Sequence, residues 1–229
     1  MKILCTICGR GGSKGIKNKN LTKIKGKPLI YYSIKQAIKS KLFDEIVVST
    51  DGRKIQRIAQ RYGASSWFLR KKKLSSDKAA KLPVIKDSLI RSEKYFNKVF
   101  DYVIDLDISS PLRNIQDIKG AFKKFLKNNN DNLFSVYEAK KNPYFNMVER
   151  INNKIIISKK SKKFFTSRQT SPKVFSLNAS IYIWKRETLL KCKTLIGKKT
   201  EIYEMPQERS IDIDSNLDLK MVKSLIKKI

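Results

Sequence analysis

The sequence contains no histidine and little negative charge. Its 229 residues include 51 Lys and Arg but 20 Asp and Glu, so the formal net charge is +31. Without histidine, acid–base catalysis by an imidazole group is excluded. The three cysteines are an odd number, which favours reduced thiols. Cys5 and Cys8 have C-x-x-C spacing, but they fall within an apolar run that predicts a buried strand, and no histidine completes a zinc site.

Long apolar segments are also lacking, because no stretch approaches the roughly 20 residues that a membrane helix needs. The first residues predict a strand followed by a loop rather than a signal peptide, so we expect a cytoplasmic protein without a membrane span. An apolar content of 41% is sufficient for a buried core. The length favours a single α/β domain over residues 1–229.

The positive charge allows two interpretations. Lys and Arg release the counterions of a phosphate backbone, so a basic RNA-binding protein on an α/β scaffold is one alternative. However, the lysines are spread over almost every expected helix and turn, with modest runs at 70–73 and 159–163. This distribution favours a general compositional bias without a specific nucleic-acid partner, and the charge will still attract anionic substrates.

Apolar runs alternate with segments of helical periodicity over the first 140 residues. This alternation predicts a mostly parallel sheet with helices on both faces, in which ligands bind beyond the carboxyl ends of the strands. The expected strands are Ile3–Cys8, Glu45–Ser49, Ser65–Leu69, Tyr102–Leu106 and Leu133–Tyr137, and the expected helices are Leu29–Lys39, Arg53–Tyr62, Val84–Phe96 and Gln116–Leu126.

The rhythm changes from about residue 142 to residue 178. Met147–Arg150 and Lys154–Ile157 flank an Ile-Asn-Asn turn and predict a hairpin outside the main sheet. The chain then returns to the sheet. The remaining expected elements are the strands Ser180–Trp184 and Glu201–Met205 and a last helix, Leu217–Ile226, that Ser215 and Asp218 can cap.

A basic, glycine-rich loop, Arg10-Gly11-Gly12-Ser13-Lys14-Gly15, follows the first expected strand. Glycines let backbone N–H groups approach an anion, and the two basic side chains supply opposite charge, so the loop suits a triphosphate. The order Ser-Lys-Gly does not fit a Walker loop, and the spacing does not fit the dinucleotide motif. The alternative is a simple turn with solvated basic residues.

Asp212 and Asp214 stand two residues apart in an Ile-Asp-Ile-Asp stretch. On an extended backbone their carboxylates project from the same face, which suits a hard cation such as Mg²⁺. A carboxylate there can also accept the proton of an attacking hydroxyl group. The alternative is a solvated acidic strand end, with the isoleucines in the core.

Together these segments resemble the acylneuraminate cytidylyltransferase family, which makes CMP-activated sialic acid and related nonulosonic acids. The resemblance runs in the family's order over nearly the whole chain. The segments that carry it are residues 10–29, Val48 to Asp51, Leu106 to Arg113, Arg168-Gln169 with Asn178 to Tyr182, and Ser210 to Asp214.

The resemblance implies a mostly parallel Rossmann-like nucleotidyltransferase sheet with a small dimerisation insertion at about 142–178. It implies a Mg²⁺-dependent homodimer that transfers CMP from CTP to the anomeric hydroxyl of an acidic nine-carbon sugar and releases pyrophosphate. A Kdo-type cytidylyltransferase, which acts on an eight-carbon acid, is the alternative within the enzyme class, although its characteristic first loop differs from Arg10 to Gly15.

The resemblance also implies residue roles around the nucleotide. Arg10 and Lys14 are the expected catalytic residues on the triphosphate, together with Asp214 as principal metal ligand and Asp212 as its neighbour. A solvated basic loop is an equally good interpretation of residues 70–73. The implied nucleotide-binding residues are Arg10, Gly11, Gly12, Ser13, Lys14, Asn20 and Arg70.

The acceptor side departs from the family pattern at two positions. Asp107 stands where sialic acid enzymes commonly have glutamine, and Lys81 stands where a small hydroxyl residue is frequent. A carboxylate only accepts hydrogen bonds, whereas an amide also donates them, so the acceptor is left open among the nonulosonic acids. Tyr182 fits a core strand equally well. The implied sugar-binding residues are Asp107, Ser109, Arg168, Gln169, Asn178 and Tyr182.

Overall fold

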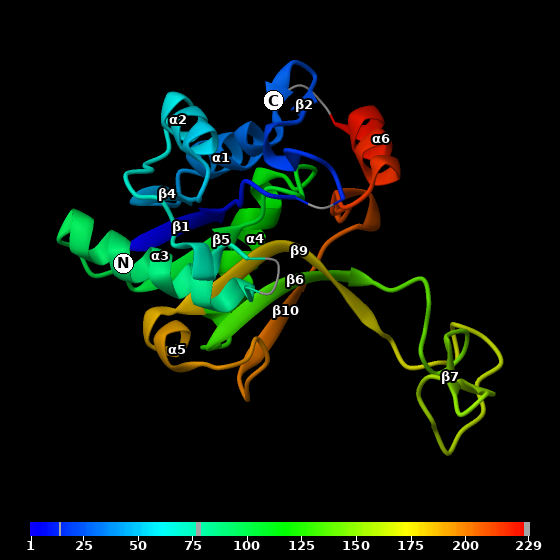
Figure 1. Cartoon of the computed structure of the whole chain (residues 1–229). Coiled ribbons are helices and arrows are strands. Elements are labelled where there is room, and N and C mark those ends of the chain that lie inside the picture. Colours follow the sequence, from blue (N-terminus) through cyan, green and yellow to red (C-terminus); the bar gives the residue numbers. More distant parts are fainter. Residues whose placement is uncertain (14, 77–78, 227–229) are drawn as a thin grey trace.

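A six-stranded sheet is the centre of the computed structural model, which describes residues 1–13, 15–76 and 79–226. The strand order is β10-β6-β9-β5-β1-β4 within the described residues, and Figure 1 shows the sheet running through the molecule. The strands are β1 (Ile3–Cys8), β4 (Glu45–Ser49), β5 (Tyr102–Leu106), β6 (Asn132–Glu138), β9 (Phe175–Lys185) and β10 (Thr200–Glu204).

The predicted, mostly parallel sheet is confirmed. β1 pairs in parallel with β4 and with β5, and β10 pairs in parallel with β6, whereas β9 runs antiparallel between β5 and β6. β1, β4 and β5 therefore end at the same edge of the sheet. The loops that follow these three strands carry the glycine-rich motif, Asp51 and Asp107, so parallel pairing brings them together.

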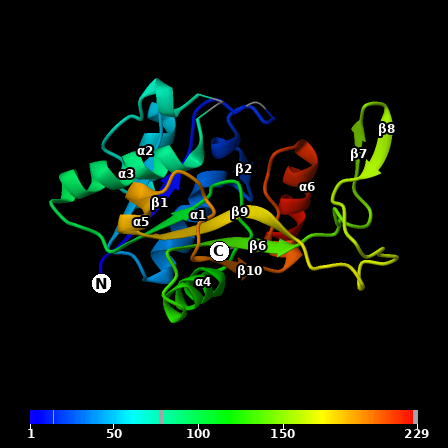
Figure 2. The same cartoon turned by 90° about the horizontal axis from the view of Figure 1, so that it is seen from below.

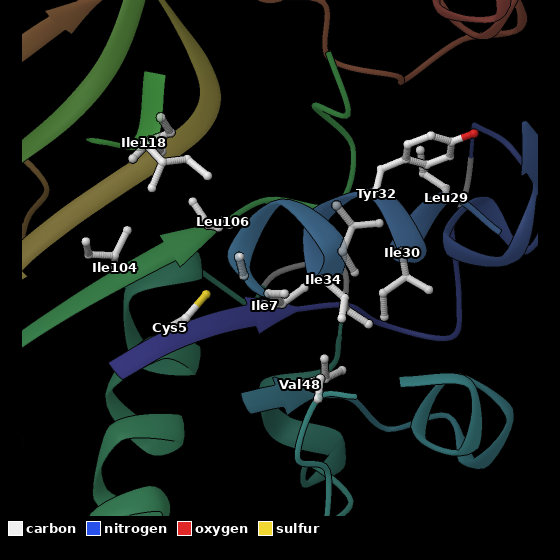
Figure 3. Close-up of a cluster of buried hydrophobic side chains, with 14 of the residues drawn as sticks. Cys5, Ile7, Leu29, Ile30, Tyr32, Ile34, Val48, Ile104, Leu106 and Ile118 are labelled. Atoms are coloured by element: carbon white, nitrogen blue, oxygen red, sulfur yellow. The ribbon is translucent and has the colours of Figure 1, made fainter. Parts of the chain in front are cut away.

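Helices cover both faces of the sheet. The alternation of side chains along β1 divides the core, because Ile3, Cys5 and Ile7 pack against one set of helices while Leu4 faces the other side. Figure 3 shows Cys5 and Ile7 against Ile34 on the first side. That side includes α1 (Leu29–Ser40), α2 (Arg53–Arg61), α4 (Ile115–Lys127) and α6 (Asn216–Leu225), and the other side includes α3 (Lys81–Phe96) and α5 (Arg186–Lys191).

The strand predicted at Ser65–Leu69 is wrong. This segment meets β4 through two isolated bridges, from Ser65 to Val47 and from Leu69 to Thr50. Between them, the hydroxyl of Ser66 donates to the carbonyl oxygen of Val48 at 2.8 Å. A side chain thus occupies an acceptor that a continuous ladder would give to a backbone N–H group, so the ladder is interrupted.

Two helix starts show how local chemistry sets the boundaries. α3 begins at Lys81, three residues before the predicted start, because Pro83 is compatible with the first turn of a helix. For α6, the predicted cap is confirmed: Ser215 accepts from the backbone of Asp218, whose carboxylate accepts from the backbone of Ser215.

No helix in the described part of the chain is long and apolar enough to cross a membrane. Short 3₁₀ helices lie at Lys19–Leu21, Lys72–Leu74 and Gln207–Arg209.

The predicted hairpin in the excursion is confirmed as β7 (Val148–Ile151) and β8 (Lys154–Ile157), which pair antiparallel. Asn152 and Asn153 both have positive φ, at 48° and 59°, as a tight two-residue hairpin turn requires. Figure 2 shows this hairpin standing apart from the sheet, and the chain returns through β9. A further small ribbon pairs β2 (Lys23–Ile24) with β3 (Lys27–Pro28).

Candidate active site

A cavity of about 400 Å³ lies beyond the carboxyl ends of β1 and β5. Segments far apart in the sequence meet there, as the parallel sheet predicts. Among its lining residues are Gly9 directly after β1, Arg10, Ser13 and Gly15 from the glycine-rich loop, Lys19 and Asn20 from the following 3₁₀ helix, Asp107 and Ser109 from the loop after β5, and Asp214 from near the carboxyl end.

The glycine-rich loop is held by its neighbours. Its backbone N–H groups donate from Gly9 to the carbonyl of Ser49 at 3.0 Å and from Gly11 to Oδ1 of Asp51 at 2.8 Å. The amide of Asn20 donates to the carbonyl of Arg10 at 2.9 Å. Asn20 thus supports the loop from behind in this structure. Lys14 lies outside the described residues, and the neighbouring Gly12 is exposed.

Close approach explains why Gly15 must be glycine. A Cβ atom at this position would overlap with the backbone oxygen of Asp214, whereas a Cβ at Gly12 would meet no atom within 4 Å. The loop and the acidic segment are therefore packed backbone to backbone at Gly15 and Asp214, at the wall of the cavity. A side chain at Gly15 would force them apart.

Lys19 is a cavity residue that sequence reasoning missed. Its ammonium group donates to the carbonyl of Ile213 at 2.6 Å and to Oδ1 of Asp214 at 2.9 Å. The contact joins the amino-terminal loop to the acidic segment. No local signal separates Lys19 from the neighbouring Lys17, because only the fold places Asp214 beside it.

The two predicted metal ligands have different environments. The side chain of Asp214 is 76% exposed, whereas Asp212 is partly buried and its Oδ1, which is shielded from solvent, has no hydrogen-bond partner among the described residues. Burial and then the negative charge of Asp107 raise the pKa of Asp212 to about 6. Between the two acids, buried Ile213 donates its N–H to the carbonyl of Ser109 at 2.9 Å, which ties the segment to the loop after β5.

This acid pair fits a magnesium ion that also binds substrate. Within the described residues no group of three or more His, Cys, Asp or Glu side chains could hold a metal alone. Mg²⁺, however, is commonly held by one or two carboxylates together with water and phosphate oxygens. The unpartnered oxygen of Asp212 and the exposed carboxylate of Asp214 match that donor set.

Asp107 is fixed at the cavity wall by three donors. Its Oδ1 accepts from the N–H of Ser109 at 3.0 Å and from the Ser109 hydroxyl at 2.7 Å, and its Oδ2 lies 2.6 Å from Nζ of Lys81. Burial alone would raise the pKa of Asp107, but the charge of Lys81 and these hydrogen bonds outweigh it and keep the pKa below its ordinary value. Asp107 is therefore an ionised carboxylate.

Buried Arg113 holds the backbone around this wall. Its guanidinium donates to the carbonyl of Asp107 at 2.8 Å and to the carbonyl of Ser180 at 2.9 Å, which links the loop after β5 to β9. Burial lowers the pKa of Arg113 to about 10, a value at which the group stays charged at neutral pH. Arg113 is thus a structural support behind the cavity.

Two of the predicted sugar-binding residues lie in the interior. Asn178 accepts from the hydroxyl of Ser135 at 2.6 Å and donates to the hydroxyl of Ser210 at 2.9 Å. Tyr182 stacks on Trp184 with the ring centroids 5.8 Å apart, in the core beneath α3. Asn178 and Tyr182 are not part of the cavity lining that the described residues form.

Three further predicted residues, Arg168, Gln169 and Arg70, also lie outside the cavity lining. Arg168 and Gln169 are exposed in the excursion, where Arg168 pairs with Glu138 at 2.9 Å. Arg70 is buried beside β4 and donates to the carbonyl of Ser49 at 3.2 Å and to the hydroxyl of Ser75 at 3.1 Å. The structure therefore brings together Arg10, Ser13, Asn20, Asp107, Ser109 and Asp214, and leaves Arg168, Gln169 and Arg70 outside the cavity lining.

A glycine-rich loop after the first strand lies beside an acidic segment at the end of a mostly parallel sheet, an arrangement that suits an α/β protein that binds a nucleotide. Comparison with known proteins specifies the class. Residues 4–229 match the family described as "Cytidylyltransferase", and the chain belongs to this family. This membership confirms the resemblance found in the sequence.

Two curated relatives match over almost their whole length. The chain is 51% identical to the post-translational flagellin modification protein B of Campylobacter coli, over 99% of this chain and 95% of the relative. It is also 51% identical to the CMP-N,N'-diacetyllegionaminic acid synthase of Campylobacter jejuni, over 98% of this chain and 95% of the relative.

The fold is also that of a solved synthetase. The structure of CMP:2-keto-3-deoxy-manno-octonic acid synthetase complexed with CTP superposes with a TM-score of 0.71, over 98% of each chain, at 16% sequence identity. At this identity the likeness concerns the fold alone. The Rossmann-like nucleotidyltransferase fold expected from the sequence is thereby confirmed.

Proposed function

We propose that this cytidylyltransferase transfers CMP from CTP to the anomeric hydroxyl of a nonulosonic acid and releases pyrophosphate, with N,N'-diacetyllegionaminic acid as its acceptor. The observation that carries the proposal is the cavity in which the basic glycine-rich loop faces Asp214. The 51% identity to a CMP-N,N'-diacetyllegionaminic acid synthase supports this choice of acceptor. The proposal also places the enzyme in the cytoplasm, where CTP is made.

The residues around the cavity divide the chemistry between charge and orientation. Arg10 and Lys14 neutralise the triphosphate and stabilise the charge that builds up on the leaving pyrophosphate. The backbone of the glycine-rich loop approaches the phosphates closely, and the sugar hydroxyl is held in line with the α-phosphorus. Because the chain has no histidine, a carboxylate at the cavity would accept the proton of the attacking hydroxyl.

Magnesium dependence is part of the proposal. Asp212 and Asp214 would hold the ion, which neutralises phosphate charge and orients the reacting groups when it is bound. Removal of divalent cations with EDTA should abolish turnover, and added Mg²⁺ should restore it. Full activity in excess EDTA would contradict the proposed role of the acid pair.

A homodimer built through residues 142–178 is also part of the proposal. The hairpin exposes Val148, Ile151 and Ile155, and Figure 1 shows it projecting from the body. Apolar side chains on a projecting arm favour a protein partner. Light scattering should give twice the mass of the chain. If Arg168 acts on a partner's cavity, mixing the inactive variants Arg168→Ala and Asp214→Asn should restore part of the activity.

Pyrophosphate release tests the proposed reaction. The four common ribonucleoside triphosphates are assayed with Mg²⁺ against N,N'-diacetyllegionaminate, pseudaminate, N-acetylneuraminate and Kdo. We expect release that requires CTP and is fastest with N,N'-diacetyllegionaminate. Release with Kdo alone would favour the Kdo-type alternative. Silence from folded protein over the whole panel, with tight and salt-sensitive RNA binding, would favour the RNA-binding alternative.

A further inference from the structure

We propose that Lys81 and Asp107 act as one unit that selects the acceptor sugar, by presenting to the cavity a fixed carboxylate that accepts a hydrogen bond from an uncharged donor on the sugar. That donor is an acylamino N–H or a hydroxyl group. The inference rests on the proposed function and deepens it. Asp107 lines the cavity, whereas Lys81 stands behind it and acts through Asp107, so Lys81 is a positioning residue.

The first observation is that Lys81 and Asp107 are in direct contact. Lys81 and Asp107 are 26 residues apart in the sequence and 2.6 Å apart in the structure. The ammonium group also lies 4.2 Å from the centre of the Tyr182 ring, which restricts its position further. Because each residue determines the surroundings of the other, their effects on the cavity are coupled.

The second observation is that a fully buried carboxylate shares the same ammonium group. Lys81 also pairs with Asp105 at 3.1 Å, and buried Asp105 accepts from the hydroxyl of Thr6 at 2.7 Å. The charged guanidinium of Arg113 supplies a second positive charge beside the two carboxylates. Lys81 is therefore held by Asp105 as well as by Asp107, which fixes its position behind the cavity wall.

The ionised carboxylate of Asp107 determines which substrate groups can bind there. It accepts hydrogen bonds and cannot donate them, so phosphates and the carboxylate of the sugar gain no hydrogen bond from it and are attracted to Arg10 and Lys19 in the same cavity. Uncharged donors remain, and an ionised carboxylate accepts strong hydrogen bonds from them. N,N'-diacetyllegionaminic acid carries two acetamido groups, as its name states, and each of them offers an N–H donor of this kind.

A glutamine at 107 with a serine at 81 would form a different wall. That pair is uncharged, and the amide both donates and accepts. Because a binding site that leaves a buried polar group unpaired discriminates strongly, the exchange should alter the acceptor preference rather than weaken all binding equally. Lys81 is the first residue of α3, and its replacement would also remove a positive charge from the positive end of that helix.

The test compares the wild type with Asp107→Gln, Lys81→Ser and the double variant, using steady-state kinetics with N,N'-diacetyllegionaminate and N-acetylneuraminate. We expect the double variant to lower the ratio of kcat/KM for the first acceptor over the second by about tenfold or more. The change should lie mainly in KM for the sugar, while KM for CTP stays within about threefold. A matched control is Lys98→Ser, which breaks a lysine–carboxylate pair with Glu45 outside the cavity and should leave the ratio unchanged.

The outcomes separate this inference from the reaction itself. An unchanged acceptor ratio in a folded double variant, or a rise in KM for CTP alone, overturns the role of the pair while the wild type still turns over. A wild type that turns over no nonulosonic acid overturns the proposed function and this inference together. If Asp107→Gln does not fold, Asp107→Asn, which is closer in size to aspartate, supplies the same comparison.

Discussion

Nζ of Lys81 lies 2.6 Å from Oδ2 of Asp107, at the wall of the cavity. Burial alone would lower the pKa of Lys81, but the charges of Asp107 and Asp105 outweigh it and raise that pKa above its ordinary value. The pKa of Asp107 is lowered by the same contact. Both groups therefore remain charged through the neutral pH range.

The pair predicts a specific dependence of stability on pH. Because the pKa of Asp107 is lower in the folded chain than in the unfolded chain, its ionisation stabilises the fold above about pH 4, and this contribution is lost as the pH falls below that value. Lys81→Met leaves two carboxylates unpaired, so it should cost about 3–5 kcal/mol at pH 7. The cost should shrink towards pH 4, since protonation then relieves the unpaired charges.

Urea unfolding at about pH 7, 5.5 and 4 measures this difference, because these values run from full ionisation to about the midpoint of an ordinary aspartate titration. Lys98→Met provides the control. Its pair with Glu45 is about as exposed as the Lys81–Asp107 pair, but it lacks a fully buried second carboxylate such as Asp105, so the cost should stay at about 1 kcal/mol or less. An equal cost for Lys81→Met at all three pH values would mean that Asp107 does not depend on Lys81 for its charge.

Asp214→Asn should inactivate the enzyme without unfolding it. The carboxylate is 76% exposed, so its loss has little effect on packing, whereas removing a group that stabilises transferred charge commonly costs about 100-fold or more in kcat. Turnover and thermal melting are measured together. Glu204→Gln, an exposed acid on β10 outside the cavity, is the control and should retain full activity. Substantial turnover by Asp214→Asn would remove Asp214 from the catalytic set.

Gly15→Ala should destabilise the chain, because the new methyl group overlaps with the backbone of Asp214. Overpacking of this kind costs about 1–3 kcal/mol. Gly12→Ala introduces the same methyl group where no atom lies within 4 Å, and it should change the unfolding free energy little. Similar values for the two variants would argue against the close packing of loop and acidic segment.

Asn178→Ala should act through stability. Its side chain bridges Ser135 on β6 and Ser210, which precedes the acid pair. Leaving two buried hydroxyl groups without this partner should cost about 2–4 kcal/mol in urea unfolding. The KM for CTP should change by a smaller factor than the equilibrium constant of unfolding does. A fully stable variant would show that the bridge is dispensable.

The elements with clear periodicity could be predicted from the sequence. β1, β4 and β5 appear within the expected bounds, because continuous apolar runs report burial on both faces. The segment Ser65–Leu69 also contains an apolar run, but the hydroxyl of Ser66 replaces a backbone donor there, and no pattern of apolar residues indicates that exchange.

The site residues that belong to motifs directly after a strand could be predicted from the sequence. Those whose place in the site depends on tertiary contacts could not. Arg10, Asp107 and Asp214 meet in one cavity because parallel strands end at one edge. Lys19 could not be distinguished from neighbouring lysines. The pairing of Lys81 with Asp107 was equally hidden, since only the packing of α3 against the sheet brings the two residues together.

Identification of the product is the most direct test of the central claim. Purified protein is incubated with CTP, Mg²⁺ and N,N'-diacetyllegionaminate. The products are then separated, and their masses are measured by mass spectrometry. We predict a CMP-sugar that appears in step with pyrophosphate and is absent with Asp214→Asn. Unreacted sugar after full incubation of folded wild-type protein, or transfer from another nucleotide in preference to CTP, would contradict the account.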